Sequence, residues 1–147
     1  MGSQDQHARL FTLEEAQTLV HEIEPLVAEI KAAFRKIRRE ITEASRATGI
    51  PPSNPRLSAR IEERGVATPL VERVNNLIRR INEKGCVVNG PEAGLVDFPA
   101  LLGSEIVLLC WRHGETGISH YHRIPEGFAG RKPLLDTRKD SASSTIH

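Results

Sequence analysis

The amino-acid sequence predicts an α+β fold, in which a long antiparallel helical hairpin packs on a small antiparallel β-sheet of three or four strands. Between residues 12 and 85, apolar residues recur at intervals of three and four, which is the period of an amphipathic helix. Between residues 86 and 134, they occur in short runs separated by glycine-containing turns, as in strands. Aromatic residues make up only 4% of the chain, which favours a core of Leu, Ile and Val between helices over a β-sandwich.

The length of the chain fits one domain. A chain of 147 residues can bury enough surface for a core of its own. The predicted domain covers residues 10–135, with the helices over 12–85 and the sheet over 86–134. We expect residues 1–9 to be a flexible N-terminus and the polar residues 136–147 to be a disordered tail.

Composition excludes several classes of protein. The 20 basic and 19 acidic residues nearly cancel, which argues against a dedicated binder of nucleic acid or of anionic membranes. The sequence has neither an apolar run long enough to cross a bilayer nor the pattern of a signal peptide, so we expect a cytoplasmic protein with no membrane contact. Its two cysteines, Cys86 and Cys110, are expected to be free thiols.

The first helix has a clear start and a clear end. Thr12 and Glu15 have the spacing of a capping box, and Gly49 is a typical C-terminal stop. Pro25 lies inside the apolar pattern, where its ring should bend or interrupt the helix. The pattern itself consists of Leu19, Ile23, Leu26, Ile30, Phe34, Ile37, Ile41 and Ala44.

A proline-rich linker over residues 50–56 precedes the second part of the hairpin. A short helical piece around Leu57 and Ile61 is followed by a break at Gly65. The second helix then carries an apolar stripe and ends at Gly85. Its stripe consists of Ala67, Val71, Val74, Ile78 and Ile81. Both stripes are longer than a small sheet can cover, so we expect a homodimer formed through the helices, as in a coiled coil.

The C-terminal half predicts short strands. Residues 86–88 form one candidate strand, and residues 95–98 form a second that Pro99 should close. Residues 105–112 and 118–124 should pair as a hairpin, because the segment between them contains two glycines suited to a tight turn.

This hairpin carries the residues best suited to bind a metal. His120 and His122 are two residues apart in an extended segment, so both imidazoles lie on one face of the sheet. A three-residue loop would place Cys110 opposite His120 and give a set of two His and one Cys for zinc or iron. A four-residue loop would place Trp111 there instead, and the imidazoles would then only pack and form hydrogen bonds. The sequence leaves both registers open.

A second group of residues suits a small anionic ligand. Arg131 follows two glycines, and its planar guanidinium matches a carboxylate or phosphate. Asp97, Glu115 and Trp111 could contribute to this ligand site, and Asp97 and Glu115 could instead complete a metal site. The alternatives are an internal ion pair between Arg131 and Asp97, and a place for Trp111 in the core.

Four sequence motifs resemble one family. FTLEEA at 11–16, GLVDFPAL at 94–101, LCWRHGE at 109–115 and GFAGRKPL at 127–134 are similar to the domain of unknown function 2203 family of small bacterial and archaeal proteins. The resemblance covers about residues 10–135. It implies no activity, but its motif residues here are Asp97, Cys110, Trp111, Gly114, Glu115, His122, Gly127 and Arg131.

Two functions are therefore expected. The first is binding of a metal ion or a small anionic ligand at the site on the C-terminal hairpin, with catalysis left open. The second is a structural or adaptor protein that binds a partner through its helices and has no ligand site. A ligand-binding protein should lose its ligand when His122 is replaced, whereas an adaptor should lose its assembly when the helix stripes are replaced.

Overall fold

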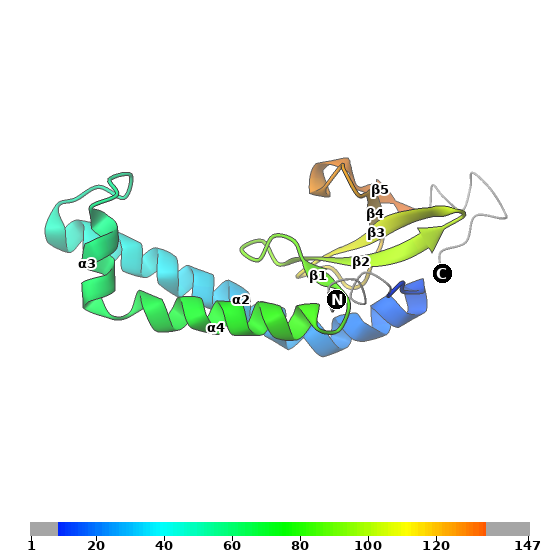
Figure 1. Cartoon of the computed structure of the whole chain (residues 1–147), viewed down its shortest axis with the longest axis horizontal. Coiled ribbons are helices and arrows are strands. Elements are labelled where there is room, and N and C mark those ends of the chain that lie inside the picture. Colours follow the sequence, from blue (N-terminus) through cyan, green and yellow to red (C-terminus); the bar gives the residue numbers. More distant parts are fainter. Residues whose placement is uncertain (1–8, 135–147) are drawn as a thin grey trace, which may run out of the picture.

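The computed structural model describes residues 9–134 and has an α+β fold. It has three α-helices and a five-stranded antiparallel sheet, and the two longer helices pass along one side of the sheet (Figure 1). The predicted flexible N-terminus and disordered tail lie outside the described residues, apart from Arg9. No helix in the described range is long and apolar enough to span a bilayer.

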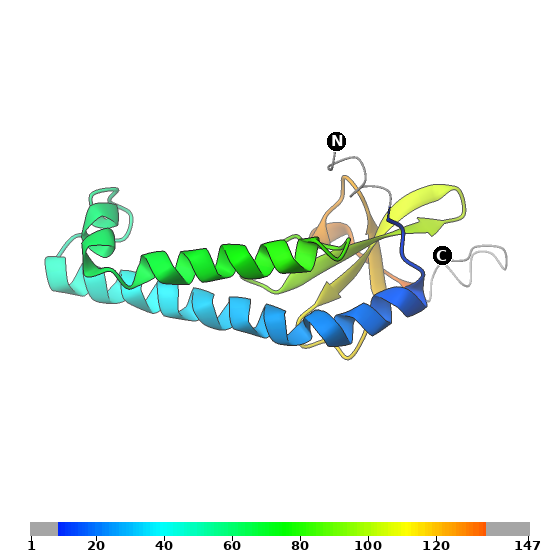
Figure 2. The ribbon, with the colours of Figure 1, turned by 60° about the horizontal axis from the view of Figure 1, so that its bottom comes forward.

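The first helix, α2, covers Leu13–Thr48 and confirms both predicted ends. Thr12 accepts a hydrogen bond from the backbone N–H of Glu15, and the Glu15 carboxylate accepts one from the N–H of Thr12. Gly49 closes the helix in the left-handed conformation with a φ of 73°. Pro25 lies within α2 without interrupting it, and Figure 2 shows a bend in the N-terminal part of the helix.

Two further helices follow the proline-rich segment. The short helix α3 (Leu57–Arg64) stands at the far end of the molecule, and α4 (Ala67–Asn82) returns alongside α2 toward the sheet (Figures 1 and 2). The predicted C-terminal stop at Gly85 lies three residues beyond the end of α4, within the turn that leads to the first strand.

The sheet has five strands in sequence order, so the prediction of three or four was wrong. The strand that the sequence did not reveal is β5, which is only two residues long and therefore has no readable alternation. The strands are β1 (Val87–Val88), β2 (Leu95–Leu102), β3 (Glu105–Arg112), β4 (His120–Arg123) and β5 (Lys132–Pro133), and their order is β1-β2-β3-β4-β5.

Pro99 does not close β2, contrary to the prediction. Within a strand, the N–H and C=O groups of one residue point to the same edge. The carbonyl oxygen of Pro99 accepts a hydrogen bond from the N–H of Phe11 at 2.7 Å, so this residue's polar groups point away from β3. The missing N–H of proline therefore removes no hydrogen bond of the β2–β3 ladder, and the strand continues to Leu102.

The two faces of the sheet have different roles. One face packs on α2 and α4 and carries the apolar core, which includes Phe98, Leu109, Trp111 and Tyr121. The other face carries Asp97, Cys110 and His122, because residues paired directly across strands share a face. Figure 1 shows the segment between β4 and β5 on the side of the sheet away from the helices, and the side chains of Asp97, Cys110 and His122 are buried on this face.

Candidate functional site

The pairing of β3 with β4 decides which side chains meet. Cys110 lies opposite His120, which is the register expected for a three-residue loop. Asp97 of β2 lies opposite Cys110 on the other side of β3. His122, two residues after His120, lies opposite Leu108.

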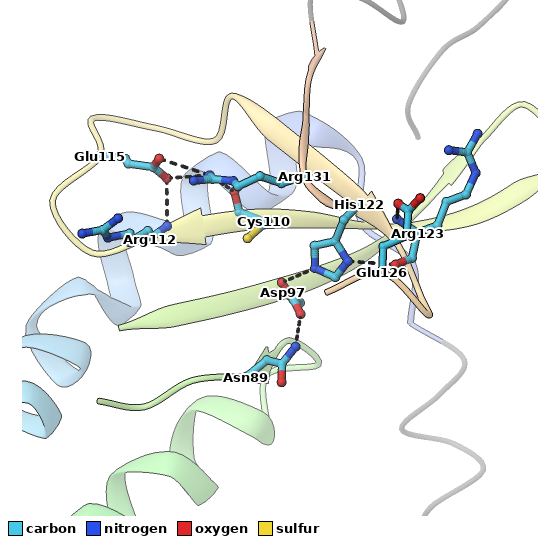
Figure 3. Close-up of polar contacts among 9 residues, drawn as sticks. All are labelled: Asn89, Asp97, Cys110, Arg112, Glu115, His122, Arg123, Glu126 and Arg131. Carbon is cyan, nitrogen blue, oxygen red and sulfur yellow. Dashed lines mark hydrogen bonds and ion pairs between the residues drawn. The ribbon is translucent and has the colours of Figure 1, made fainter. Parts of the chain in front are cut away.

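Three side chains from three adjacent strands form what we call the metal triad: Asp97, Cys110 and His122. One oxygen of Asp97, the Sγ of Cys110 and a ring nitrogen of His122 all lie within 4.8 Å of one another (Figure 3). His120 lies outside this group, and its Nδ1 is 2.9 Å from the hydroxyl of Ser119. The structure thus brings Cys110 and His122, two of the three candidate metal ligands, together with Asp97, and leaves the third, His120, apart.

The contacts of His122 place two hydrogen-bond acceptors face to face. Its Nδ1 lies 2.9 Å from the carbonyl oxygen of Arg123, which can only accept, so Nδ1 carries the hydrogen. In a neutral imidazole, Nε2 then has a lone pair, and it lies 3.2 Å from Oδ1 of Asp97. This contact is attractive only if a proton or a metal cation lies between the two atoms.

Asn89 holds the other oxygen of Asp97. Its side-chain amide donates to Oδ2 at 2.8 Å, and its backbone N–H donates to the carbonyl oxygen of Leu95 at 2.9 Å, which fixes the turn between β1 and β2. Sequence reasoning missed Asn89 as a site residue, because an Asn-Gly-Pro segment indicates only a turn. The turn therefore orients the carboxylate as well as joining two strands.

Cys110 is a protonated thiol in this environment. Burial raises the pKa of its thiol to about 12, and the nearby charge of Asp97 adds to the increase. A nucleophilic cysteine needs a lowered pKa and an imidazole nitrogen to take its proton, but both nitrogens of His122 already face oxygen atoms. The triad is therefore not built as a cysteine-hydrolase site, whereas a thiol of this kind can bind a metal by releasing its proton.

The triad is closed to solvent. Asp97 is 2% exposed, and Cys110 and His122 are each 1% exposed. A carboxylate at this depth is costly unless a positive charge and hydrogen bonds compensate for its lost hydration. Asn89 supplies one hydrogen bond and the Cys110 thiol a second, and a proton or a metal cation between Oδ1 and His122 would supply the positive charge.

A second cluster lies beside the triad and is centred on Arg131. The Nη2 of Arg131 donates to the carbonyl oxygen of Cys110 at 3.3 Å and lies 3.1 Å from Glu115 (Figure 3). The sequence analysis considered an ion pair between Arg131 and Asp97. The structure does contain an internal ion pair of Arg131, but its partner is Glu115 and not Asp97.

Glu115 is fixed by several donors and is not a solvated loop residue. Its Oε1 accepts a hydrogen bond from the N–H of Arg112 at 2.9 Å, and its backbone carbonyl accepts one from the indole of Trp111 at 3.2 Å. Burial alone would raise the pKa of its carboxyl, but the hydrogen bonds from Arg131 and Arg112 and the charges of Arg131 and His120 hold it below its usual range. Glu115 is therefore ionised at neutral pH.

The fold and the site define a small α+β protein with a buried Asp, Cys and His on the face of the sheet that points away from the helices. The chain belongs to the family described as "Uncharacterized conserved protein (DUF2203)", whose model matches residues 9–134. This match confirms the resemblance carried by the four sequence motifs. No curated protein and no solved structure matches the chain.

Proposed function

We propose that the protein binds a transition metal ion, zinc in the first instance, through Asp97, Cys110 and His122. The observation that carries this proposal is the facing pair of acceptors, Nε2 of His122 and Oδ1 of Asp97, 3.2 Å apart and next to the Cys110 sulfur. A metal cation bound between them would replace the proton that otherwise has to lie there, and would join the two atoms by coordination. It also compensates for the buried charge of Asp97.

The donor set suits zinc. Imidazole nitrogen, thiolate sulfur and carboxylate oxygen are all ligands that zinc binds in proteins, whereas magnesium and calcium prefer oxygen alone. A metal-bound histidine usually donates its other N–H to a carbonyl or carboxylate, and the Nδ1 of His122 is placed to do so toward Arg123. Three protein ligands leave one tetrahedral position for water or another ligand, as in zinc sites that act on substrates.

Elemental analysis tests this proposal directly. Untagged protein would be purified without chelator in separate preparations supplied with zinc, iron or manganese. The preparation supplied with zinc should retain about one zinc ion per chain. His122→Ala should lose the metal, and His120→Ala, two residues away on the same strand, is the matched control that should keep it. Circular dichroism would show that both variants are folded. Absence of metal from folded wild-type protein, or equal loss in both variants, would refute the proposal.

A cytoplasmic location is part of this proposal. Both cysteines are buried thiols and neither is in a disulfide, which suits a reducing compartment. Fractionation of the producing cells should place the protein with cytosolic markers, and recovery from an oxidising compartment would contradict the assignment.

A second candidate function is self-association or partner binding through the helices. At the far end from the sheet, α2, α3 and α4 line an apolar groove of about 350 Å³ whose walls include Ile37, Ile41, Ile61 and Val71. Val71 is 44% exposed there. A second copy would bury this groove as a bundle of helices, in agreement with the homodimer expected from the two stripes.

Light scattering of the purified protein tests the homodimer. The wild-type mass should be twice the chain mass of 16.3 kDa. Val71→Asp should reduce it to one chain, whereas Val87→Asp at a similarly exposed position on β1 should not. A monomeric wild type would refute the homodimer and leave the groove for a different partner.

A further inference from the structure

The second cluster contains one unsatisfied donor. Within residues 9–134, the Nε of Arg131 is the single buried side-chain nitrogen or oxygen without a hydrogen-bond partner. Buried donors are nearly always paired, because an unpaired one loses its hydration without compensation. This donor lies next to the metal triad, since the same guanidinium contacts the carbonyl oxygen of Cys110.

The geometry of the ion pair explains why Nε is left over. Both oxygens of Glu115 lie 3.1 Å from the same nitrogen, Nη2 of Arg131. A carboxylate that uses the full guanidinium fork would contact two nitrogens through two parallel hydrogen bonds. Glu115 therefore neutralises the charge of Arg131 but does not engage its Nε edge.

The orientation of the guanidinium is fixed. Its central carbon lies 4.6 Å from the centre of the Phe128 ring, a cation–π contact that sets the plane of the group. The side chain of Arg131 is 13% exposed, and that of Glu115 is 27% exposed. The cluster is thus partly exposed, whereas the triad and the Nε of Arg131 are buried. A ligand of Nε therefore has to enter as the more exposed Glu115 side chain moves aside.

We infer that Arg131 binds the carboxylate group of a small organic anion, beside the proposed metal, through its Nε and through the Nη2 hydrogen that Glu115 gives up. The inference rests on the proposed function for the neighbouring metal, which would offer its fourth position to the same ligand. The charges of a zinc ion, the Cys110 thiolate and Asp97 cancel, and those of Arg131 and Glu115 cancel as well. A site with this balance favours a monoanionic carboxylate over a dianionic phosphate.

Trp111 provides the readout. It is the only tryptophan of the chain, and its indole donates to the backbone carbonyl of Glu115 at 3.2 Å. Acetate and, in a separate arm, inorganic phosphate would be titrated into zinc-loaded and metal-free protein while the Trp111 fluorescence is recorded. We expect acetate to give a saturable change with a dissociation constant of about 1 mM or below in the zinc-loaded protein, and phosphate to give none.

Two substitutions should act in opposite directions. Arg131→Lys keeps the charge but removes the fork, so acetate affinity should fall at least about tenfold. Glu115→Gln removes the competing carboxylate and should raise acetate affinity several-fold. Arg123→Lys is the matched control, because Arg123 is an arginine on the same sheet that pairs with Glu105 outside the cluster, and it should leave the affinity unchanged.

The outcomes separate this inference from the metal proposal. Zinc content is measured on the same samples, so a zinc-loaded protein with no saturable response to acetate overturns the carboxylate site and leaves the metal proposal intact. A response that survives Arg131→Lys also overturns it, as does binding of phosphate in preference to acetate. If wild-type protein retains no zinc but still responds to acetate, and Arg131→Lys abolishes that response, the anion site stands and only the metal proposal is refuted.

Discussion

Zinc affinity should rise about tenfold for each pH unit between pH 7 and pH 9, because Cys110 has to lose its proton before its sulfur can bind the metal. Burial raises the pKa of this thiol to about 12, so it is almost wholly protonated throughout that range. One proton is then released for each zinc bound, and the affinity should increase about 100-fold over the two units.

The cost of deprotonation follows from the same value. Forming the thiolate at pH 7 from a group with a pKa of about 12 costs about 7 kcal/mol, at about 1.36 kcal/mol per unit. About 4 kcal/mol of this cost comes from the increase above the ordinary value of 9.0. Coordination has to offset the full amount, so the apparent affinity at neutral pH should be far weaker than that of a preformed thiolate site.

Competition with a fluorescent zinc chelator at each pH gives the affinity, and calorimetry in two buffers of different ionisation enthalpy counts the protons released. Cys110→Ala should bind zinc weakly and show no such slope. Cys86→Ala is the control, because the Cys86 thiol is also buried but donates to the carbonyl oxygen of Ile81, away from the triad. Equal slopes in wild type and Cys110→Ala, or a flat profile in wild type, would refute the reasoning.

Three further predictions concern the site and the core. Asn89→Ala should weaken zinc binding about 10- to 100-fold because Asp97 loses its orienting hydrogen bond, with Asn75→Ala on the exposed face of α4 as the control in the same chelator assay. Phe98→Ala should lower the free energy of unfolding in urea by about 3–5 kcal/mol, because this fully buried ring lies in the core, and a loss below about 1 kcal/mol would contradict its position there. Folding lowers the pKa of the Glu115 carboxyl below its ordinary value of 4.5. The ion pair therefore contributes its full stabilisation above pH 4.5, and this contribution is lost as the pH falls through the pKa of the folded protein. The excess stability of wild type over Glu115→Gln should therefore be greatest at about pH 7 and should decrease as the pH falls below 4.5, and a constant difference would show that the pair is not responsible.

The class of fold could be predicted from the sequence because hydrophobic periodicity and turn residues are local signals. The capping box of Thr12 and Glu15 is confirmed for the same reason. The predicted end of β2 was wrong because the effect of Pro99 depends on which edge of the strand its polar groups face. The hydrogen bond from Phe11 that reveals this edge joins segments far apart in the chain, so no local pattern indicates it.

The site was only partly predictable. Alternation places His120 and His122 on one face, but it does not say which imidazole points toward Cys110. The structure selects His122, whose Nε2 lies 3.2 Å from Oδ1 of Asp97. The register places His120 directly opposite Cys110, but its ring turns to Ser119. Asp97 and Cys110 share a row only through the pairing of β2 with β3, which no local pattern reveals.

The length of α2 has a consequence for how parts of the molecule unfold locally. The helix is about 54 Å long at 1.5 Å per residue, and its buried residues belong to the main core only as far as Ala33. Beyond that point, the buried carboxylate of Glu40 is paired with Arg64 of α3, and the one other buried residue of α2 is Ala44. Amide hydrogens in the last three turns of α2 should therefore exchange with solvent deuterium through local fraying, while those before Ala33 exchange only when the whole domain unfolds. One continuous helix would thus report two different free energies of opening.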